Sequence, residues 1–396
     1  MIQGRNLLEV YPQLLNEIRN NSLEAAPRGQ RVTEHNGPIV WKIEKPWEWA
    51  LLIPGRRINP FFALAEVVWM WSGKGGIDFI SYYNKSMTQF ADEGIPYFNA
   101  AYGRRARHAG YDERPFREIP YLTTPNIATE KVDVDQIQFV IKKLKADPET
   151  RQAAISLWDP VKDNFTKSKD HPCNNMIYVS QRGYVAGTDK IAPIPGKLNM
   201  TVVIRSNDLI WGIPYNMIQF VHLQALIAGS LGHEMGTFTV MCNNLHYYHD
   251  LYPDTLVTVL GWNHNLSERQ VELDETVHDA AFANWDSKLM LWDIDRFDGF
   301  IRNIWDSLEK ELRWGFEEEA KPVWYHTRWL KLNDMLTVNN VPVYWQMVFS
   351  MMFLFHVRKA KASAVASDIV AKMPLAMRWL IEDFNRKADK ESNVQA

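Results

Sequence analysis

The sequence predicts an α+β protein, and three observations lead to this class. Segments with the helical spacing of apolar residues and segments with strand character both occur over the first two thirds of the chain. The two kinds do not follow each other in the regular βαβα order of a doubly wound sheet. From about Leu266 onward, the pattern is helical almost throughout.

The elements of the first two thirds are expected in a definite order. Helices are predicted at residues 4–21, 59–76, 134–150 and 213–232, and strands at residues 151–160, 173–183, 197–208 and 236–250. The second helix is almost wholly apolar, carries Glu66, and is expected to end at the glycine cluster that begins at Gly73. Glycines and prolines between residues 181 and 197 predict a loop.

The composition argues against several classes of function. Lys and Arg number 44, Asp and Glu number 47, and the net charge of −3 provides no field that would favour nucleic acid or a membrane surface. Two cysteines cannot form a disulfide framework, and there is no Cys/His spacing typical of zinc. No signal-peptide layout and no apolar run of ~18 residues occur. We therefore expect a cytoplasmic protein without a metal and without nucleic-acid or membrane partners.

Polar residues gather where the predicted strands end, in "PCNN", "RSND" and "NNLHYYH". Cys173 lies in the first motif, and a thiol attacks well only where positive charge favours the thiolate. Arg205 and Ser206, in the second motif, offer a cation and a hydroxyl, a combination that also suits a phosphate. Taken singly, Cys173 is either a core residue or a nucleophile, whereas Cys242, inside an apolar segment, is expected in the core.

Three further polar side chains follow the same pattern. Asn216 lies in "GIPYN" at the start of a helix, where it either satisfies the local backbone or presents a donor and an acceptor to a nucleobase edge. His246 and Tyr248 are two residues apart on a predicted strand and share a face. They form either an ordinary polar pair or a contact for a sugar hydroxyl.

The order and spacing of these motifs resemble the thymidylate synthase superfamily. The interval from Asp208 through Gly212 to Asn216 matches without a gap, and "AEVVWMWSG", "NAAYGRRAR" and "DPETRQAAISLW" match upstream motifs in the right order. The resemblance covers roughly residues 1 to 255. It implies a thymidylate-synthase-like fold, a mixed sheet covered by helices, with a catalytic domain at residues 1–265. Residues 266–396 are then a mainly helical extension packed on that domain.

The resemblance implies a reaction. Cys173 would add to C6 of a uracil nucleotide, and C5 would then take a one-carbon unit from 5,10-methylenetetrahydrofolate. Arg205 would help to activate the thiol, Tyr102 would lie near it, and Glu66 would order water and move protons. A homodimer is implied, in which Arg151 reaches across the interface. The implied nucleotide contacts are Arg28 (or Arg31), Arg151, Arg205, Ser206, Asn174, Asn216, His246 and Tyr248, and the implied folate contacts are Asp208, Met87 and Phe90.

The departures from the synthase pattern concern how well the site excludes water. Asp170 stands where synthases have a bulky apolar residue, Met87 and Phe90 stand at two tryptophan positions, and the chain ends in the polar "DKESNVQA". A wetter site, with water held by Asp170 or Glu66, favours water over hydride as the final reactant. The sequence therefore predicts a dUMP hydroxymethylase of the kind that phages use to make modified DNA.

The choice of base rests on Asn216, because asparagine suits uracil whereas aspartate at this position suits cytosine. Asn174 stands where synthases usually have histidine, which leaves the reading of the base open, and Gln152 replaces a second arginine. The alternatives are a thymidylate synthase that makes dTMP, a dCMP hydroxymethylase, and an inactive homologue that serves as a scaffold.

Overall fold

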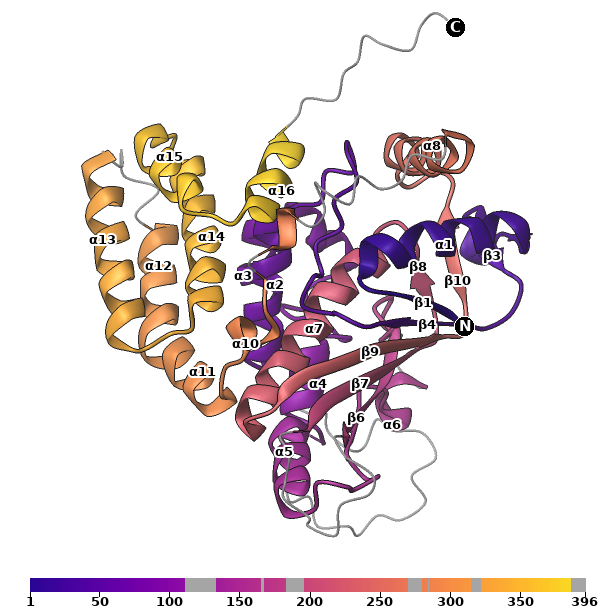
Figure 1. The fold of residues 1–396 in the computed structure, drawn as a ribbon, viewed down its shortest axis with the longest axis horizontal. Coiled ribbons are helices and arrows are strands. Elements are labelled where there is room, and N and C mark those ends of the chain that lie inside the picture. Colours follow the sequence, from indigo (N-terminus) through magenta and orange to yellow (C-terminus); the bar gives the residue numbers. More distant parts are fainter. Residues whose placement is uncertain are drawn as a thin grey trace, which may run out of the picture.

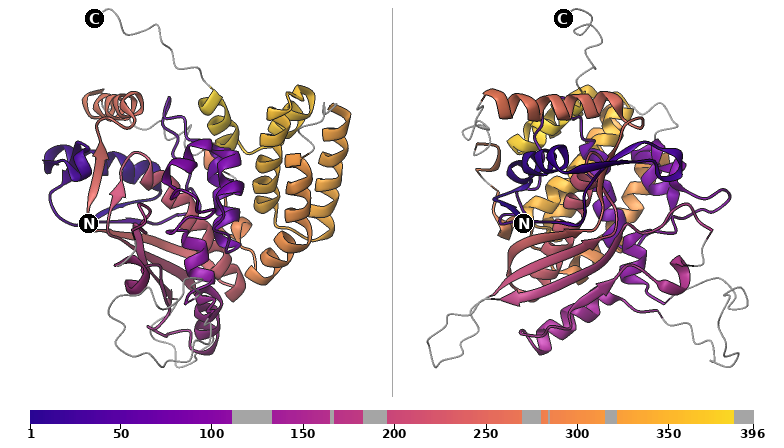
Figure 2. Two further views of the ribbon diagram at one scale, coloured as in Figure 1. Left: turned by 180° about the vertical axis from the view of Figure 1, so that it is seen from behind. Right: turned by 90° about the vertical axis from the view of Figure 1, so that its right-hand side faces the viewer.

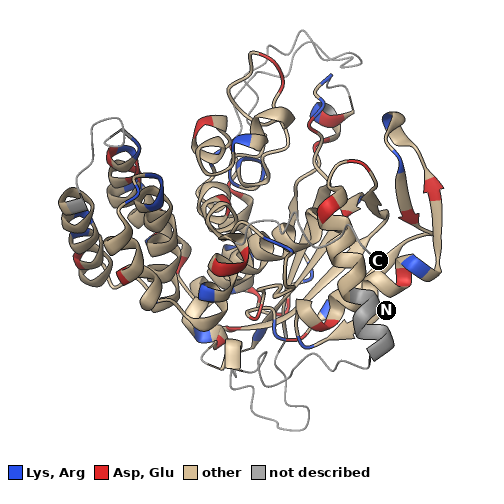
Figure 3. Ribbon diagram, turned by 90° about the horizontal axis from the view of Figure 1, so that it is seen from above, with Lys and Arg blue, Asp and Glu red and all other residues tan. Residues whose placement is uncertain are grey.

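The protein combines mixed β-sheets with many helices, which confirms the α+β prediction (Figure 1). The computed structural model describes residues 1–110, 133–164, 167–182, 196–269, 280–283, 285–314 and 322–385. Within these ranges, no helix has the length and apolar character needed to cross a membrane. Figure 3 shows acidic and basic residues interspersed over the ribbon, in line with the small net charge.

The main sheet has six strands in the order β1-β4-β9-β7-β6-β5. Its central strands β7 and β9 are parallel and are connected by helix α7, which packs on both of them. Side chains along β7 are alternately buried and half-exposed, so the sheet has one buried face and one open face. The strands are β1 (Ile2–Gly4), β4 (Ile39–Ile43), β9 (Glu234–Cys242), β7 (Lys197–Ile204), β6 (Asn174–Arg182) and β5 (Ala154–Ser156).

A second sheet of four strands, in the order β2-β3-β10-β8, lies beside the first. Its strands are β2 (Ser22–Ala25), β3 (Val32–His35), β10 (Leu245–Tyr248) and β8 (Asn207–Asp208). The single strands predicted at residues 197–208 and 236–250 are therefore wrong, because each is divided between the two sheets. The backbone of Asn243 still donates to Ile204 in the main sheet, whereas Asn244 accepts from Asn207 in the second sheet. The residues of "RSND" and "HYY" consequently meet at the junction of the sheets.

Helices α1 (Leu7–Asn20) and α7 (Gly212–Leu231) pack on the sheets, and α2 (Pro60–Trp71) packs on α7. Every residue of α2 is buried, as its apolar sequence requires, and the Asn59 side chain caps its first turn. As predicted, α2 ends just before the glycine cluster, where Gly73 adopts a φ of +78°. The shorter elements are η1 (Pro27–Gly29), α3 (Ile77–Tyr83), η2 (Lys85–Phe90), α4 (Tyr102–Arg107), α5 (Gln136–Ala146) and α6 (Pro160–Asp163).

The C-terminal region is helical, as predicted, and forms the bundle on the left of Figure 1. Helices α14 and α16 both pack on α2, and the apolar side chains of both regions form one continuous core. The domain boundary at residue 265 stays a prediction. The elements after β10 are α8 (Pro253–Arg269), α10 (Ser287–Met290), α11 (Ile294–Phe300), the π-helix η4 (Ile301–Trp305), α12 (Asp306–Trp314), α13 (Pro322–Val338), α14 (Val343–Lys359), α15 (Ser363–Ala371) and α16 (Leu375–Asn385).

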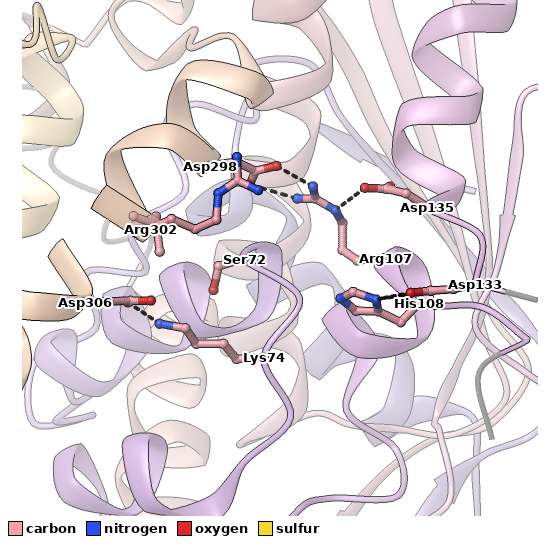
Figure 4. Close-up of a pocket in the computed structure, with 10 residues that line it drawn as sticks. Ser72, Lys74, Arg107, His108, Asp133, Asp135, Asp298, Arg302 and Asp306 are labelled. Carbon is pink, nitrogen blue, oxygen red and sulfur yellow. Dashed lines mark hydrogen bonds and ion pairs between the residues drawn. The ribbon is translucent and has the colours of Figure 1, made fainter. Parts of the chain in front are cut away.

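A charged pocket of about 390 Å³ lies where α11 and α12 meet the ends of α2 and α4 (Figure 4). Arg107 is its central residue and is paired with Asp135 and Asp298. The same guanidinium donates to the carbonyl oxygen of Trp71 at 2.7 Å, at the end of α2. Arg107 therefore joins the helix that carries Glu66, the helix that begins with Tyr102, and the C-terminal region.

Candidate active site

Cys173 lies at the entry to β6, beside the guanidinium of Arg205. The distance from Arg205 Nη2 to Cys173 Sγ is 3.8 Å. Arg205 is held in this position because its Nε donates to the Pro172 carbonyl at 2.9 Å and its backbone N–H donates to the Cys173 carbonyl at 2.9 Å. Burial raises the pKa of the Cys173 thiol, and the charge of Arg205 opposes this shift. The predicted pairing of thiol and arginine is present.

Tyr102 and Asp170 support the segment that carries the thiol. The backbone N–H of Cys173 donates to the Tyr102 hydroxyl at 3.2 Å. Asp170 Oδ2 accepts from the backbone N–H of Ala100 at 2.8 Å, just before α4. Burial raises the pKa of Asp170, this hydrogen bond opposes the shift, and the Asp170 charge in turn raises the pKa of Cys173. Asp170 is thus near enough to influence the thiol.

Of the two predicted phosphate arginines near the N-terminus, Arg28 reaches the site. Arg28 hydrogen-bonds the side chain of Tyr248, and its charge lowers the pKa of Cys173. Arg28 lies in the exposed turn η1 and has a φ of 53°, in the left-handed region. Arg31 instead forms an ion pair of 2.8 Å with Asp250 on the surface.

Three asparagines form a chain of hydrogen bonds next to the thiol. Asn174 Nδ2 donates to Asn216 Oδ1 at 3.4 Å, and Asn216 Nδ2 donates to Asn207 Oδ1 at 3.1 Å. Asn174 and Asn207 are buried, whereas Asn216 is half-buried at the start of α7. Asn207 was missed by the sequence reasoning, although its position between Ser206 and Asp208 in "RSND" was a usable signal.

His246 and Tyr248 share a face of β10, as predicted. Their rings meet edge to face with centroids 5.1 Å apart, and His246 Nδ1 is 2.9 Å from Asn244 Oδ1. Burial lowers the pKa of His246, which favours the neutral ring. The register of β10 and β8 places His246 opposite Asp208. The predicted sugar contact and the predicted folate contact therefore lie on the same four-stranded sheet. Ser206 is half-buried immediately before β8.

Tyr252 is a second residue that the sequence reasoning missed. Its hydroxyl lies 2.9 Å from both carboxylate oxygens of Asp208 and accepts from the Tyr248 backbone N–H at 2.8 Å. Its ring packs against the half-exposed ring of Trp211, with centroids 4.9 Å apart. The sequence feature that could have pointed to Tyr252 is its position four residues after Tyr248, the predicted sugar contact. Tyr252 connects the predicted ribose contact to the predicted folate contact.

Glu66 is buried in α2 and faces α7. It hydrogen-bonds Gln219, which lies one turn after Asn216, and burial raises its pKa to about 7. Its Oε2 atom has no hydrogen-bond partner within the described part of the chain. A carboxyl group with a pKa near neutrality can both take and give a proton at physiological pH.

Other predicted residues lie outside this network. Arg151 is exposed just before β5, and Gln152 accepts from Lys143 Nζ at 2.7 Å. Met87 is half-buried and packs on the core from η2, whereas Phe90 is 43% exposed. The predicted roles of these residues therefore stay predictions. The C-terminal "DKESNVQA" lies outside the described residues, and within them no cluster of His, Cys, Asp and Glu is arranged for a metal.

Comparisons with known proteins agree with this geometry. Residues 10–285 match the model of the thymidylate synthase family. The chain is 34% identical over 251 residues to the deoxyuridylate hydroxymethyltransferase of Bacillus phage SP01, an alignment that covers 63% of this chain and 59% of the relative. It is 28% identical over 252 residues to the enzyme of the same name from Pseudomonas phage M6, covering 63% and 62%.

A thymidylate synthase of Bacillus licheniformis is 34% identical over 115 residues, which is 29% of this chain and 36% of that protein. The matched part thus spans about three fifths of the two phage relatives and about a third of the bacterial one. Since the family model covers more than half of the sequence, including every residue of the network around Cys173, the chain belongs to the thymidylate synthase family.

Proposed function

We propose that the protein transfers a one-carbon unit to C5 of dUMP and completes the reaction with water, which gives 5-hydroxymethyl-dUMP for modified DNA. The observation that carries this proposal is the thiol of Cys173 beside the guanidinium of Arg205, with the amide of Asn216 held close by. Two phage relatives named deoxyuridylate hydroxymethyltransferase support the same reaction. The co-substrate 5,10-methylenetetrahydrofolate supplies the carbon when bound.

In this proposal, the residues around the thiol bind and activate the nucleotide. Cys173 Sγ attacks C6, so that C5 becomes a nucleophilic carbon. Arg205 stabilises the thiolate and, with Ser206 and Arg28, receives the 5′-phosphate. Asn216 reads the base, and His246 and Tyr248 bind the sugar. Asp208, with Trp211 beside it, offers a carboxylate and an aromatic wall to the folate ring.

The proposed final step needs water, and two carboxyl groups support it, of which Glu66 is buried and Asp170 is half-buried. Asp170 lies against the thiol segment and Glu66 faces α7, and burial raises the pKa of both. Once tetrahydrofolate and the C5 proton have left, an exocyclic methylene remains on C5, and such a carboxylate can position water and accept its proton while the oxygen bonds to that carbon. The electron pair then moves through the ring and expels Cys173 from C6 as the thiolate, which restores the C5–C6 double bond. The partly exposed Phe90 supports a folate wall that is less closed than one built of tryptophans.

We also propose a homodimer that forms through the open face of the main sheet. This face carries the exposed apolar side chains Tyr178 and Met241, which are 48% and 46% exposed. The strands of the sheet lie along one side of the molecule (Figure 2). An exposed apolar surface on a sheet is typical of a protein interface. Arg151, exposed at the edge of this sheet, would then reach the phosphate site of the partner.

The test is to incubate the protein with 5,10-methylenetetrahydrofolate and either dUMP or dCMP, and to identify both products by mass spectrometry. The proposal predicts 5-hydroxymethyl-dUMP with tetrahydrofolate. Formation of dTMP with dihydrofolate would instead identify a thymidylate synthase, and a product only from dCMP would identify a cytosine hydroxymethylase. Absence of any product, with Cys173 unmodified by either nucleotide, would favour the scaffold.

A further inference from the structure

The chain of asparagines next to Cys173 determines how Asn216 can meet a base. An amide nitrogen carries two hydrogens and an amide oxygen two lone pairs. Asn174 uses one lone pair of Asn216 Oδ1, and Asn207 accepts one hydrogen of Asn216 Nδ2. Asn216 therefore keeps one lone pair and one hydrogen for a ligand, on atoms whose positions are already assigned by its neighbours.

The two ends of the chain are fixed by different parts of the fold. Asn174 is fully buried, and its side chain also hydrogen-bonds the Tyr102 hydroxyl. At the other end, Asn207 is 2% exposed, and its backbone pairs with Asn244 in the second sheet. The Asn207 Nδ2 atom is buried and has no hydrogen-bond partner among the described residues. A buried donor without a partner is costly, and the orientation that carries this cost is the one in which Asn207 Oδ1 accepts from Asn216 Nδ2.

Gly212 makes room for this arrangement. A Cβ atom at Gly212 would lie 2.5 Å from Asn207 Oδ1, the atom that accepts from Asn216. Any side chain at residue 212 would therefore push Asn207 away from Asn216. The glycine that precedes the base-reading residue in "GIPYN" is thus explained by the position of Asn207.

Uracil and cytosine present opposite patterns of hydrogen-bond donors and acceptors to such an amide. Uracil has a donor at N3 and an acceptor at O4, whereas cytosine has an acceptor at N3 and a donor at N4. An asparagine that is free to turn over by 180° matches either base, because the turn exchanges its oxygen and its nitrogen. An asparagine that is held in one orientation matches only one of them.

We propose that Asn207 is a positioning residue that holds the amide of Asn216 in one orientation and thereby sets the discrimination between uracil and cytosine nucleotides. This inference rests on the proposed function, in which Asn216 reads the base. Asn207 acts through Asn216 and does not contact the nucleotide. The hydrogen bond of 3.1 Å between them is the physical link.

The experiment measures the dissociation constants of dUMP and dCMP by calorimetry for the full chain and its variants. Asn207→Ala removes the acceptor. We expect the ratio of the affinity for dUMP to the affinity for dCMP to fall about tenfold, which corresponds to the loss of one hydrogen bond. Gly212→Ala displaces Asn207 and should lower the ratio as well. Asn207→Asp keeps an acceptor toward Asn216, so this ratio should stay close to that of the unsubstituted protein.

Asn199 provides a matched control. Its Oδ1 accepts from Thr237, and a Cβ atom at Gly236 would lie 2.2 Å from that oxygen, so the pair repeats the Asn207–Gly212 arrangement on the main sheet, away from β8. Asn199→Ala should reduce stability and leave the ratio unchanged. An equal loss of both affinities in Asn207→Ala would overturn this inference alone. Failure of the unsubstituted protein to bind either nucleotide would overturn the proposed function and the inference together.

Discussion

The hydroxyl group of Tyr252 lies 2.9 Å from both carboxylate oxygens of Asp208. The same carboxylate accepts from the backbone N–H groups of Ile210 and Trp211, at 2.7 Å and 3.1 Å. Three donors therefore fix one half-buried carboxylate at the place where the folate ring is expected. A hydrogen bond to a charged group contributes more than one between neutral groups, so this contact has a measurable role.

Tyr252→Phe should raise the KM for 5,10-methylenetetrahydrofolate about tenfold, because Asp208 loses a donor and gains freedom to turn. The KM for the nucleotide should change little. Steady-state kinetics with each substrate varied in turn measure the two values. Tyr247→Phe is the control, since the Tyr247 ring packs on His249 instead. A rise in the nucleotide KM alone would contradict the assignment of Asp208 to the folate.

Cys173→Ala should lower turnover at least on the order of 10³-fold, because it removes the thiol that is proposed to add to C6. Nucleotide binding should persist, since Arg205 and Asn216 remain. The matched variant is Cys242→Ala, which removes a buried thiol on β9 and should reduce stability without abolishing turnover. Calorimetry and product formation test both variants, and full activity in Cys173→Ala would disprove the covalent step.

The activity should depend on pH through Glu66, whose pKa burial raises to about 7. We expect a plot of kcat against pH to have an inflection near pH 7. Glu66→Gln should lower kcat and remove this inflection. Burial also raises the pKa of Glu309 on α12 to about 7. Glu309→Gln should therefore leave the kcat profile intact, which separates a catalytic titration from a structural one.

The raised pKa of Glu66 should also affect the free energy of unfolding in a defined direction. The folded-state pKa of Glu66 lies above the ordinary 4.5, so its contribution is fully present below pH 4.5 and is lost as pH rises through about 7. The stability of Glu66→Gln relative to the unsubstituted protein should thus increase between pH 5 and pH 8, by up to roughly 3 kcal/mol. Urea unfolding at several pH values measures this difference. A difference that shrinks toward pH 8 would show that Glu66 is stabilised as a carboxylate.

The thiol of Cys173 should respond to its charged neighbours in opposite directions. Asp170 raises the pKa of Cys173 and Arg205 lowers it. Asp170→Asn should therefore shift the pH midpoint of alkylation by iodoacetamide downward, and Arg205→Gln should shift it upward. Both variants are best made on a Cys242→Ala background, so that only one thiol reacts. Equal midpoints in all three proteins would show that neither charge influences the thiol.

The contact between the catalytic region and the C-terminal helices should depend on Asp298. Asp298→Asn weakens the ion pair with the buried Arg107 and should lower the free energy of unfolding by about 2 kcal/mol. Asp295, one turn earlier on α11, accepts only an exposed hydrogen bond from the Gln138 side chain in the described contacts. Asp295→Asn should cost less than about 0.5 kcal/mol. Equal unfolding midpoints for the two variants would exclude Arg107 as the link between the regions.

Much of the fold was predictable because it depends on local patterns. The apolar run of α2, its capping residue Asn59 and the glycines that follow it specify that helix without reference to any other segment. The division of residues 236–250 between β9 and β10 was not predictable, because both parts have strand character. Which sheet each part joins depends on partners more than 30 residues distant in sequence, Ile204 and Asn207.

The sequence by itself determined the family and predicted the reactive groups, because "PCNN", "RSND" and "GIPYN" keep their order and spacing along one chain. Only the tertiary structure separated the surroundings of Arg28 and Arg31, since Arg28 hydrogen-bonds Tyr248 while Arg31 pairs with Asp250. It also revealed the hydrogen bonds that Asn207 and Tyr252 make to Asn216 and Asp208. Hydrogen bonds require a donor and an acceptor at a specific distance and direction, and these are set where the two sheets meet.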